Sequence, residues 1–463
     1  MAYITPRKCI QSILLLAFVI FIVINLHFLS PGSVGVQDGR SGMDTVRPRK
    51  PRTTNLSRDV VSRQQPHAPE KPLIQKRVST GKPSLKEEVN VDSSAQRFSD
   101  FNESLRFIID DINKKQTIRN SDKFPPVDGT YRHAWVIQVH NRDHYLKYLI
   151  NSLRETRGIE SSLLIVSHDY YCKEMFDIIT NIDFMPVMQI FYPKAMQLYK
   201  KSYPGEDPSD CPRNIKKPEA VAKGCVNAEW PDKYGHYREA AYAQTKLHWF
   251  WKLHQVFDGL DIMKNFTGYI TLIEEDHFVT KDSLHMLNKM LDSKASLCSH
   301  CRIFTLGNYD KKPTYAYTDE VVAAPEFISS KHNMAMSMNR ETYTLIKSKA
   351  KQFCDYDDYN WDWSLQYIGH EVIPGKLPTL IVKTPRVYHI GDCGVHHKGK
   401  QCNPAEKASP IKERVSANEA KLFPQALKSG RATSNTYLAY KKLKANGGWG
   451  DKRDHDLCAS FME

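Results

Sequence analysis

The sequence lacks any zinc-finger, RNA-recognition or helix-turn-helix signature, and no internal repeat is visible in its 463 residues. These absences argue against nucleic-acid binding, although 65 Lys and Arg outnumber 52 Asp and Glu and give a net charge of +13. The basic residues are spread along the chain, and a basic excess also suits a protein that handles anionic donors or lies near a membrane. We therefore expect no nucleic-acid partner.

One long apolar run, residues 9–29, has a length that suits a bilayer span, whereas the apolar core of a signal peptide is usually shorter. Arg7 and Lys8 precede it, so the positive-inside rule leaves residues 1–8 in the cytosol and sends the rest of the chain into the lumen. We therefore expect a single-pass type II membrane anchor. A long cleaved signal peptide is the alternative, and either interpretation places the bulk of the chain in the secretory pathway.

Apolar periodicity is missing from residues 30–100, which are rich in Pro, Arg, Lys, Ser and Gln. Such a segment cannot bury enough apolar surface to offset the entropy of ordering. We therefore predict a disordered stem that holds a lumenal head, residues 101–463, away from the membrane. N-glycosylation sequons begin at Asn55, Asn102 and Asn265, and the first two are expected to be exposed.

A second Cys-x-x-Cys pair is also absent, so Cys298-Ser-His-Cys301 is better interpreted as a tight disulfide than as half of a zinc site. Cys9 lies at the membrane edge, and the other nine of the 10 cysteines face an oxidising lumen, where disulfides are expected. Because nine is an odd number, at least one of them has no partner within the chain.

Within the head, continuous apolar strands alternate with helical segments, which predicts βα units and a parallel sheet. We expect, in chain order, helix 101–119, strand 134–142, helix 145–154, strand 162–169 and helix 236–253. Both strands end in polar residues, and ligands bind outside the carboxyl edge of such sheets. Arg142 is therefore a candidate partner of a diphosphate and Asp169 of a ribose or uracil, with ordinary surface polarity as the alternative.

A third expected strand, residues 269–277, ends in the triplet Glu274-Glu-Asp276, where a metal or a polyphosphate can reach the carboxylates. A distant strand-like run, residues 386–393, ends on His389. A carboxylate and a neutral imidazole brought together by the fold make a site for a divalent first-row metal such as Mn²⁺. On a membrane-anchored lumenal chain, this pairing predicts a metal-dependent transferase with a nucleotide diphosphate donor. A solvated acidic turn and a structural histidine are the alternatives.

The stretch from Cys354 to Trp363 is too acidic and too aromatic for an ordinary core. Aromatic faces stack on sugar rings, and a carboxylate within hydrogen-bond reach of a sugar hydroxyl can act as a general base. In the alternative interpretation the stretch starts a helix, with Asp357 or Asp358 as its cap and with Trp361 and Trp363 buried. Both interpretations can hold together.

Nine motifs stand in order along the head. They are Gln138-Val-His-Asn-Arg142, Ser167-His-Asp169, Asp210-Cys-Pro-Arg213, Gly235-His-Tyr-Arg-Glu239, Gln244-Thr-Lys246, Glu274-Glu-Asp-His277, Tyr356-Asp-Asp-Tyr-Asn-Trp-Asp-Trp363, His389-Ile-Gly-Asp-Cys393 and Asn446-Gly-Gly-Trp-Gly-Asp451. Together they resemble the N-acetylglucosaminyltransferase II family of Golgi glycosyltransferases. The match runs from about Phe101 to the C-terminus, and the anchor and stem match only in type. The resemblance implies an α/β head of GT-A type, a Rossmann-like mixed sheet flanked by helices.

The resemblance also assigns roles to residues. It implies UDP contacts from Gln138, Val139, His140, Asn141, Arg142, Asp169, Gln244, Thr245, Lys246, Leu247 and His248. This chain has Leu247 where the family pattern has a histidine. Asp276 and His389 resemble the metal ligands, and Asp362 resembles the catalytic base. The implied acceptor contacts are Arg213, Asp232, Asn333, Tyr359 and Trp361.

The family's disulfides map onto this chain as well. The implied pairs are Cys211–Cys225, Cys298–Cys301, Cys354–Cys458 and Cys393–Cys402. A fifth family bridge is absent, because both of its cysteines are missing, and Cys172 is left unpaired.

The resemblance implies an inverting enzyme of N-glycan biosynthesis, with UDP-GlcNAc as donor, Mn²⁺ as cofactor and a glycoprotein-bound N-glycan as acceptor. GlcNAc would be added in β-1,2 linkage to the α-1,6-arm mannose of a core that already carries GlcNAc on its α-1,3 arm, which commits the glycan to the complex type. Two alternatives stay open: transfer to the α-1,3 arm, and a catalytically weak relative that binds glycans. The expected location is the Golgi membrane, and a homo-oligomer is left open.

Overall fold

The computed structural model describes residues 91–310, 312–391, 403–437 and 443–462, which belong to one compact unit. The expected anchor, most of the expected stem, Cys9, the sequon at Asn55 and the expected Cys393–Cys402 disulfide lie outside these residues. No helix in the described part of the chain is long and apolar enough to cross a membrane.

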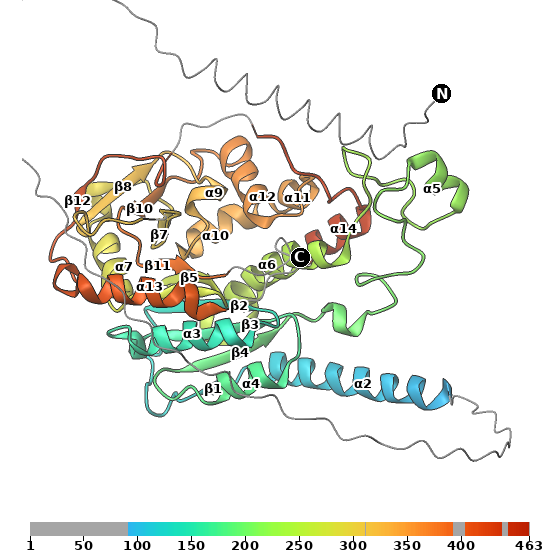
Figure 1. Cartoon of the computed structure of the whole chain (residues 1–463), viewed down its shortest axis with the longest axis horizontal. Helices are drawn as coiled ribbons and strands as arrows, with labels where there is room; N and C mark the ends of the chain where they lie inside the picture. The colour runs from blue at the N-terminus through green and yellow to red at the C-terminus, as the bar shows by residue number, and fades with distance from the viewer. Residues whose placement is uncertain (1–90, 311, 392–402, 438–442, 463) are drawn as a thin grey trace, which may run out of the picture. The chain divides into compact units, whose positions relative to one another are not determined.

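A mixed sheet runs through this unit (Figure 1). Its ten strands, among the residues that the structure describes, lie in the order β1-β4-β3-β2-β5-β9-β7-β10-β8-β12. They are β1 (Ile118–Arg119), β2 (His133–Val139), β3 (Leu163–His168), β4 (Val187–Phe191), β5 (Tyr269–Glu274), β7 (Ile303–Thr305), β8 (Glu320–Ala324), β9 (Met336–Asn339), β10 (Thr379–Val382) and β12 (Lys428–Ser429). The neighbours β4, β3, β2 and β5 are parallel, as predicted, whereas β9 pairs antiparallel with β5 and β7.

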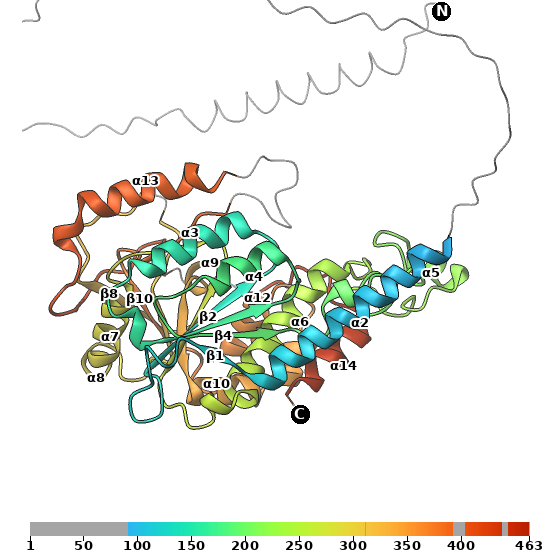
Figure 2. The ribbon, with the colours of Figure 1, turned by 90° about the horizontal axis from the view of Figure 1, so that it is seen from below.

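Helices cover both faces of this sheet, and Figure 2 shows α3 and α4 on one side of the strands and α2 and α10 on the other. The helices are α2 (Val91–Lys115), α3 (Asp143–Arg154), α4 (Lys173–Thr180), α5 (Lys217–Lys223), α6 (Ala240–His254), α7 (Ser283–Asp292), α8 (Lys294–Leu297), α9 (Ser329–His332), α10 (Arg340–Lys347), α11 (Ala350–Asp355), α12 (Trp361–Tyr367), α13 (Pro404–Ala417) and α14 (Lys452–Ser460). π-Helical segments follow α6 and α12, at Gln255–Gly259 and Ile368–Val372.

The core explains the continuous apolar runs of the sequence. Along β2, Ala134 and Val136 pack with α2, α6 and α10. The alternating residues Trp135, Ile137 and Val139 pack with α3, α4 and α7 on the other face. Side chains of a strand alternate between its two faces, so a strand covered on both sides needs apolar residues at every position.

The predicted elements of the first half of the head are confirmed with shifted ends. Helix α2 begins at Val91, inside the segment expected as stem, because its buried Leu105 and Ile109 anchor an apolar face from which the helix extends upstream. Helix α6 begins at Ala240 rather than at residue 236. The reason is that Asp232 accepts a hydrogen bond from the backbone N–H of His236 (2.8 Å) and holds that residue in the preceding loop.

The expected strand 269–277 is in fact two strands. β5 ends at Glu274, a turn follows, and β6 (His277–Val279) then pairs antiparallel with β11 (Val387–His389) in a separate small sheet. The chain turns here because the backbone N–H of Glu275 still bonds Gln138 in the main sheet (3.1 Å), whereas the Asp276 carbonyl accepts from Ile390 (2.9 Å). The small sheet places His277 directly opposite His389.

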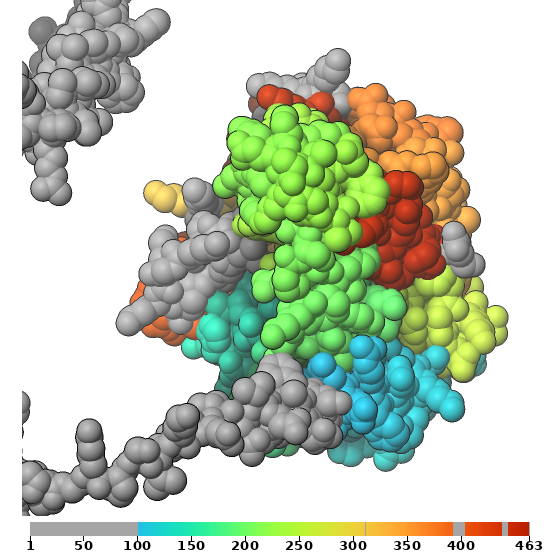
Figure 3. Space-filling model, turned by 90° about the vertical axis from the view of Figure 1, so that its right-hand side faces the viewer, coloured from blue at the N-terminus to red at the C-terminus, as the bar shows by residue number. Residues whose placement is uncertain are grey.

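The segment 200–239 and the C-terminal helix α14 lie side by side, as the green and red surfaces of Figure 3 show. Arg238 donates to both carboxylate oxygens of Asp454 on α14, at 2.8 and 3.1 Å, and to Asp210 at 3.1 Å. Arg453 on α14 donates to the same Asp210 at 2.6 Å. These charged hydrogen bonds hold the segment 200–239 against α14.

Candidate active site

The polar ends of β2, β3 and β5 meet at one edge of the main sheet, because the three strands are parallel and in register. Val139 of β2 pairs with His168 of β3, and Gln138 pairs with Glu274 of β5. The residues that follow each strand, which include Arg142, Asp169 and Asp276, therefore emerge at the same carboxyl edge. This is the place where open α/β sheets bind ligands.

Arg142 connects the end of β2 to the acidic turn. Its Nε donates to Glu275 at 2.6 Å and its Nη1 donates to Asp276 at 2.7 Å. Glu275 also accepts from the backbone N–H of His140 at 2.8 Å. Although burial raises the pKa of Asp276, hydrogen bonding to His389 and the nearby positive charges lower it well below its usual range. Asp276 is therefore held as a carboxylate, which is the form that binds a metal.

The small sheet brings His389 to Asp276, with 3.2 Å between His389 Nε2 and Asp276 Oδ2. The other carboxylate oxygen, Asp276 Oδ1, is buried and has no hydrogen-bond partner among the described residues. Buried carboxylate oxygens normally have a partner, so this oxygen is free to take a ligand. A carboxylate with an adjacent imidazole is a donor set that suits a divalent first-row cation. These residues therefore fit a divalent first-row cation, the class to which the expected Mn²⁺ belongs.

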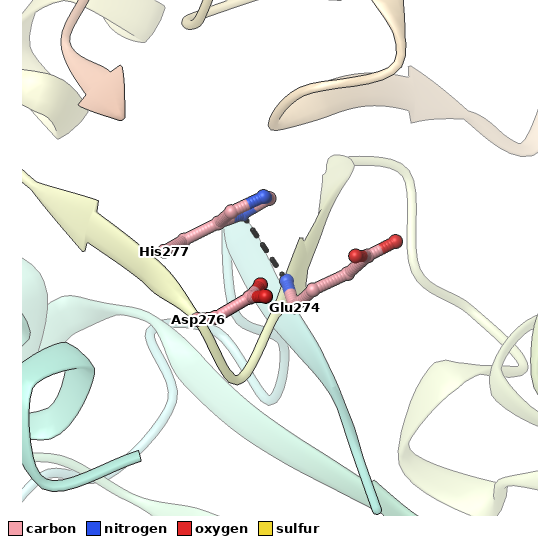
Figure 4. Close-up of side chains that lie close together, drawn as sticks. All are labelled: Glu274, Asp276 and His277. Carbon is pink, nitrogen blue, oxygen red and sulfur yellow. Dashed lines mark hydrogen bonds between the residues drawn. The ribbon is translucent and has the colours of Figure 1, made fainter. Parts of the chain in front are cut away.

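Two further donors lie in the same turn. The ligand atoms of Glu274, Asp276 and His277 lie within 4.8 Å of one another. Figure 4 shows the three side chains around the turn from β5 to β6, where His277 Nδ1 accepts from the backbone N–H of Glu274 at 3.2 Å. Burial lowers the pKa of His277 to about 4, so the ring is neutral at physiological pH. Sequence reasoning missed His277 as a donor, although its place directly after the acidic triplet was a usable signal.

Asp169 joins two of the predicted UDP contacts. Its Oδ1 lies 2.6 Å from His140 Nδ1 and its Oδ2 lies 3.1 Å from His248 Nδ1 on α6. The other ring nitrogen of His248 lies 2.8 Å from the hydroxyl of Ser167. Ser167, His248 and Asp169 thus have the order of a hydrolase triad, but Ser167 and His248 are fully buried and cannot reach a substrate. These hydrogen bonds instead hold Asp169 in place at the sheet edge.

The five predicted contacts on α6 do not share one face, because successive residues of a helix point about 100° apart. Only His248 reaches Asp169. Gln244 accepts from the backbone N–H of Met196 (2.7 Å), Thr245 donates to the carbonyl of Ala241 (3.2 Å), and Lys246 donates to the carbonyls of Tyr356 and Asp358 (3.1 and 3.0 Å). Leu247 is buried in the core, where an apolar side chain leaves no polar group without a partner.

The predicted contacts on β2 also differ among themselves. Val139 is buried in the core, and Asn141 is exposed beyond the strand end. Gln138 accepts a hydrogen bond from the buried ammonium of Lys252 on α6 at 2.7 Å. Burial lowers the pKa of Lys252 to about 7. The amide of Gln138 therefore satisfies a buried lysine, a contact that no local sequence pattern indicates.

Asp362 lies in the first turn of α12 and is half-buried. Its Oδ1 accepts from the backbone N–H of Trp363 (3.0 Å) and its Oδ2 accepts from the Asn333 amide (2.8 Å). Burial, together with the negative charges of Asp358 and Glu274, raises the pKa of Asp362 to about 7. A carboxylate with such a pKa is a strong enough base to take a proton from a hydroxyl in a transition state.

Two other acidic residues of this stretch, Asp357 and Asp358, are structural. Asp358 is fully buried and accepts from the backbone N–H groups of Asn446 (2.7 Å) and Asn360 (3.0 Å). Asp357 accepts from the backbone N–H groups of Lys233 (2.7 Å) and Trp449 (3.2 Å). The expectation that one of the two caps α12 is wrong, since the helix begins at Trp361 with Asn360 before it. Both carboxylates instead hold neighbouring loops, including the C-terminal Gly-rich motif.

The five predicted acceptor contacts occupy different environments. Asn333 touches Asp362, and Trp361 stacks on Trp249 with 4.4 Å between ring centroids, buried in the core. Tyr359 lies against Tyr242, with ring centroids 4.8 Å apart. Arg213 is exposed and pairs with Glu239 at 2.7 Å. Asp232 is buried and accepts from the backbone N–H groups of Tyr234, His236 and Gly448. Its carboxylate therefore joins two loops.

Three of the four expected disulfides are present in the described residues, Cys211–Cys225, Cys298–Cys301 and Cys354–Cys458. Cys172 is free, as expected, and its Sγ lies 2.9 Å from Glu174. Both sequons in the described region are placed. Asn265 is exposed in a turn, whereas Asn102, which was expected to be exposed, is half-buried on α2.

Comparison with known proteins agrees with this geometry. Residues 106–458 match the family profile of N-acetylglucosaminyltransferase II (MGAT2). The chain belongs to the N-acetylglucosaminyltransferase II family. The alpha-1,6-mannosyl-glycoprotein 2-beta-N-acetylglucosaminyltransferase of Rattus norvegicus is 41% identical over 359 residues, which cover 77% of this chain and 80% of the rat protein. The protein of the same name from Arabidopsis thaliana is 33% identical over 349 residues, 74% of this chain and 77% of the plant protein.

Solved structures resemble this N-acetylglucosaminyltransferase II family member much less closely. The structure of S. aureus TarS 1–349 in complex with UDP-GlcNAc has a TM-score of 0.31 and 10% identity, and the match covers 62% of this chain and 66% of that chain. A TM-score this low does not establish a shared fold. The family assignment therefore rests on the sequence match.

Proposed function

We propose that this protein is an inverting glycosyltransferase of GT-A type. In this proposal it moves GlcNAc from UDP-GlcNAc, in β-1,2 linkage, to the α-1,6-arm mannose of an N-glycan core that already carries GlcNAc on its α-1,3 arm. Family membership and the name of the relatives support the reaction. The main structural support for this reaction is Asp362, a half-buried carboxylate with a pKa of about 7. The charge of Glu274 in the acidic turn contributes to that raised pKa.

Asp276 and His389 would hold Mn²⁺, with Glu274 and His277 beside them. When bound, the ion would stabilise the negative charge that develops on the departing diphosphate. His389 and Arg142 together favour the carboxylate form of Asp276. Asp169, which bonds His140 and His248, would orient the uridine. These residues define the donor side of the site.

Asp362 defines the acceptor side. As the mannose 2-hydroxyl oxygen attacks the anomeric carbon of GlcNAc, its proton passes to Asp362 Oδ1 or Oδ2. A new C–O bond forms on one face of the sugar while the bond to UDP breaks on the other face, so the configuration inverts. The UDP leaves with the electron pair of the broken bond. Once the proton has left Asp362, the hydrogen bond from the Asn333 amide stabilises the carboxylate.

The remaining features of the protein extend the proposal to its location. We place the catalytic head in the Golgi lumen, behind a type II anchor at residues 9–29 and a stem. The apolar run and its basic flank support the anchor. The three disulfides fit an oxidising compartment.

The decisive experiment is a transfer assay with the full-length protein in detergent, UDP-GlcNAc, Mn²⁺ or EDTA, and trimannosyl cores with and without GlcNAc on the α-1,3 arm. We expect transfer only to the GlcNAc-bearing core. EDTA should abolish that transfer, because without an ion at Asp276 and His389 no cation balances the negative charge of the departing diphosphate. Transfer to the bare core would indicate the α-1,3-arm reaction instead. Binding of UDP without any transfer would indicate a glycan-binding relative.

The rate of transfer should fall as the pH drops below about 7. The pKa of Asp362 is about 7, and only its carboxylate form can accept the hydroxyl proton, so the active fraction rises with pH through that value. Well below the midpoint, kcat should change about tenfold per pH unit. A kcat profile between pH 5 and 9 checks this expectation. A profile that stays flat down to pH 5 would contradict the assignment of Asp362 as the base.

A further inference from the structure

One tyrosine outside every motif is connected to the proposed base through a single amide. Tyr309 Oη donates to Asn333 Oδ1 at 2.7 Å, and Asn333 Nδ2 donates to Asp362 Oδ2 at 2.8 Å. The three side chains come from three separate parts of the fold. Tyr309 follows β7, Asn333 directly follows α9, and Asp362 lies in the first turn of α12.

The direction of the Asn333 amide matters for Asp362. With its NH₂ group toward the carboxylate, the amide stabilises the ionised form of Asp362, which is the form that acts as a base. In the reversed orientation the amide carbonyl would face Asp362 and would favour its protonated form instead. A hydroxyl donor on the carbonyl side therefore selects the productive orientation.

Tyr309 is suited to be that donor. Burial of its hydroxyl, together with the charges of Glu274 and Asp362, raises the pKa of Tyr309 well above its usual range. The phenol therefore stays protonated throughout the physiological pH range, and its O–H can donate a hydrogen bond to Asn333. The residue as a whole is 41% exposed, so this tyrosine is not simply a core residue.

We propose that Tyr309 is a positioning residue of the transfer reaction, which locks the Asn333 amide so that Asn333 donates to Asp362. The inference rests on the proposed function, because it assumes that Asp362 is the base. It assigns Asn333, expected from the resemblance to contact the acceptor, a second task within the protein. Both Asn333 amide atoms are engaged in this chain of hydrogen bonds, and the second N–H of the amide remains available to a sugar hydroxyl.

The charged groups around α12 do not replace this contact. The elements packed against α12 carry these titratable residues: Lys351 and Asp355 on α11, Tyr242, Lys246, His248, Lys252 and His254 on α6, Lys331 and His332 on α9, and His370 and Glu371 in the π-helical segment. Lys246 bonds the carbonyls of Tyr356 and Asp358, Lys252 bonds Gln138, and His332 bonds the carbonyl of Thr436. None of these bonds reaches the carboxylate of Asp362, whose pKa is raised by burial and by the charges of Asp358 and Glu274 and is lowered by the hydrogen bonds from Trp363 and Asn333.

Tyr309→Phe tests the proposal, because it removes the hydroxyl and keeps the ring. Without the lock the pKa of Asp362 should rise by about one pH unit, so kcat should fall about tenfold at pH 6 and return to within about twofold of the unmodified protein at pH 9. The KM for UDP-GlcNAc should not change. Tyr317→Phe is the matched control, since Tyr317 is 39% exposed and lies under Lys383 rather than near Asp362, and it should leave the profile unchanged.

A double-mutant cycle with Asn333→Ala separates this role from direct contact with the acceptor. If Tyr309 acts through Asn333, the double variant should be no slower than Asn333→Ala alone. Additive losses, or a Tyr309→Phe profile with an unshifted acid limb, would overturn the proposal. Asp362→Asn serves as the reference. If it remains active, the proposed base is wrong, whereas an inactive Asp362→Asn with a normal Tyr309→Phe rejects only the positioning role.

Discussion

Asp362→Asn is expected to lower kcat for GlcNAc transfer by about 10²–10⁴-fold, the usual contribution of a general base. The amide has nearly the shape of the carboxylate but cannot accept the hydroxyl proton. UDP binding should be retained, because Asp362 has no contact with Asp169, Asp276 or His389. Single-turnover transfer rates and calorimetric titration with UDP in Mn²⁺ measure the two properties separately.

The same substitution should not destabilise the head. Burial raises the pKa of Asp362 from 3.8 to about 7, so between these values the folded chain binds more protons than the unfolded chain, and stability falls as the pH rises. Removing the charge removes that cost, and we expect an equal or higher Tm at pH 8. Asp355→Asn, at an exposed carboxylate of the same acidic stretch, is the control and should keep full activity. Loss of UDP binding or of folding in Asp362→Asn would contradict this account.

Arg238→Met should destabilise the head by about 3–5 kcal/mol, which is the usual cost of leaving a buried charge without its partner. Arg238 is 6% exposed, and its guanidinium balances Asp454, which is fully buried. It also donates to Asp210 and to the carbonyls of Gly205 and Pro204. In the variant, the side chain at position 238 can no longer bond Asp454 on α14, and the charge of Asp454 is no longer balanced by Arg238. Denaturant unfolding at pH 7 measures the free energy of unfolding.

The matched control is Arg213→Met, in the same segment of the chain. Arg213 also pairs with a carboxylate, Glu239, but both side chains are nearly half exposed, and exposed ion pairs contribute at most about 1 kcal/mol. The two variants remove the same group, but Arg238 is buried and has more hydrogen-bond partners than Arg213. Similar losses of stability in both would show that burial does not determine the strength of this network. A stable Arg238→Met would do the same.

Local sequence patterns were sufficient for the parts of the fold that are stabilised by local apolar runs. β2, β3 and the first part of β5 were predicted because both faces of the sheet are covered, and this demands unbroken apolar segments. Helix α3 was predicted because its apolar residues lie on one face. The break after Glu274 was not predicted. No Gly or Pro interrupts residues 269–277, and hydrogen bonds to two different sheets make the chain turn there.

The stretch from Cys354 to Trp363 illustrates the limit for the candidate site. Its composition indicated a functional carboxylate, and the resemblance selected Asp362, but three aspartates of similar local context have different environments. Asp357 and Asp358 face loops that lie far away in the sequence, whereas Asp362 faces Asn333. A carboxylate's pKa depends on burial and nearby charges, and these are set by residues that the local sequence does not contain.

The sequence alone therefore determined the order of the elements in the first half of the head, the acidic strand end and, through its motifs, the family, whose resemblance in turn implied the cysteine pairs of the described residues. Only the tertiary structure decided that His389 meets Asp276, that His277 lies beside both, that Lys246 and Leu247 face away from the donor side, and that Tyr309 reaches Asp362 through Asn333. The physical reason is the range of the interactions. Apolar periodicity acts over one element, whereas hydrogen bonds and charges at the site join elements that the chain brings together only when the whole sheet has formed.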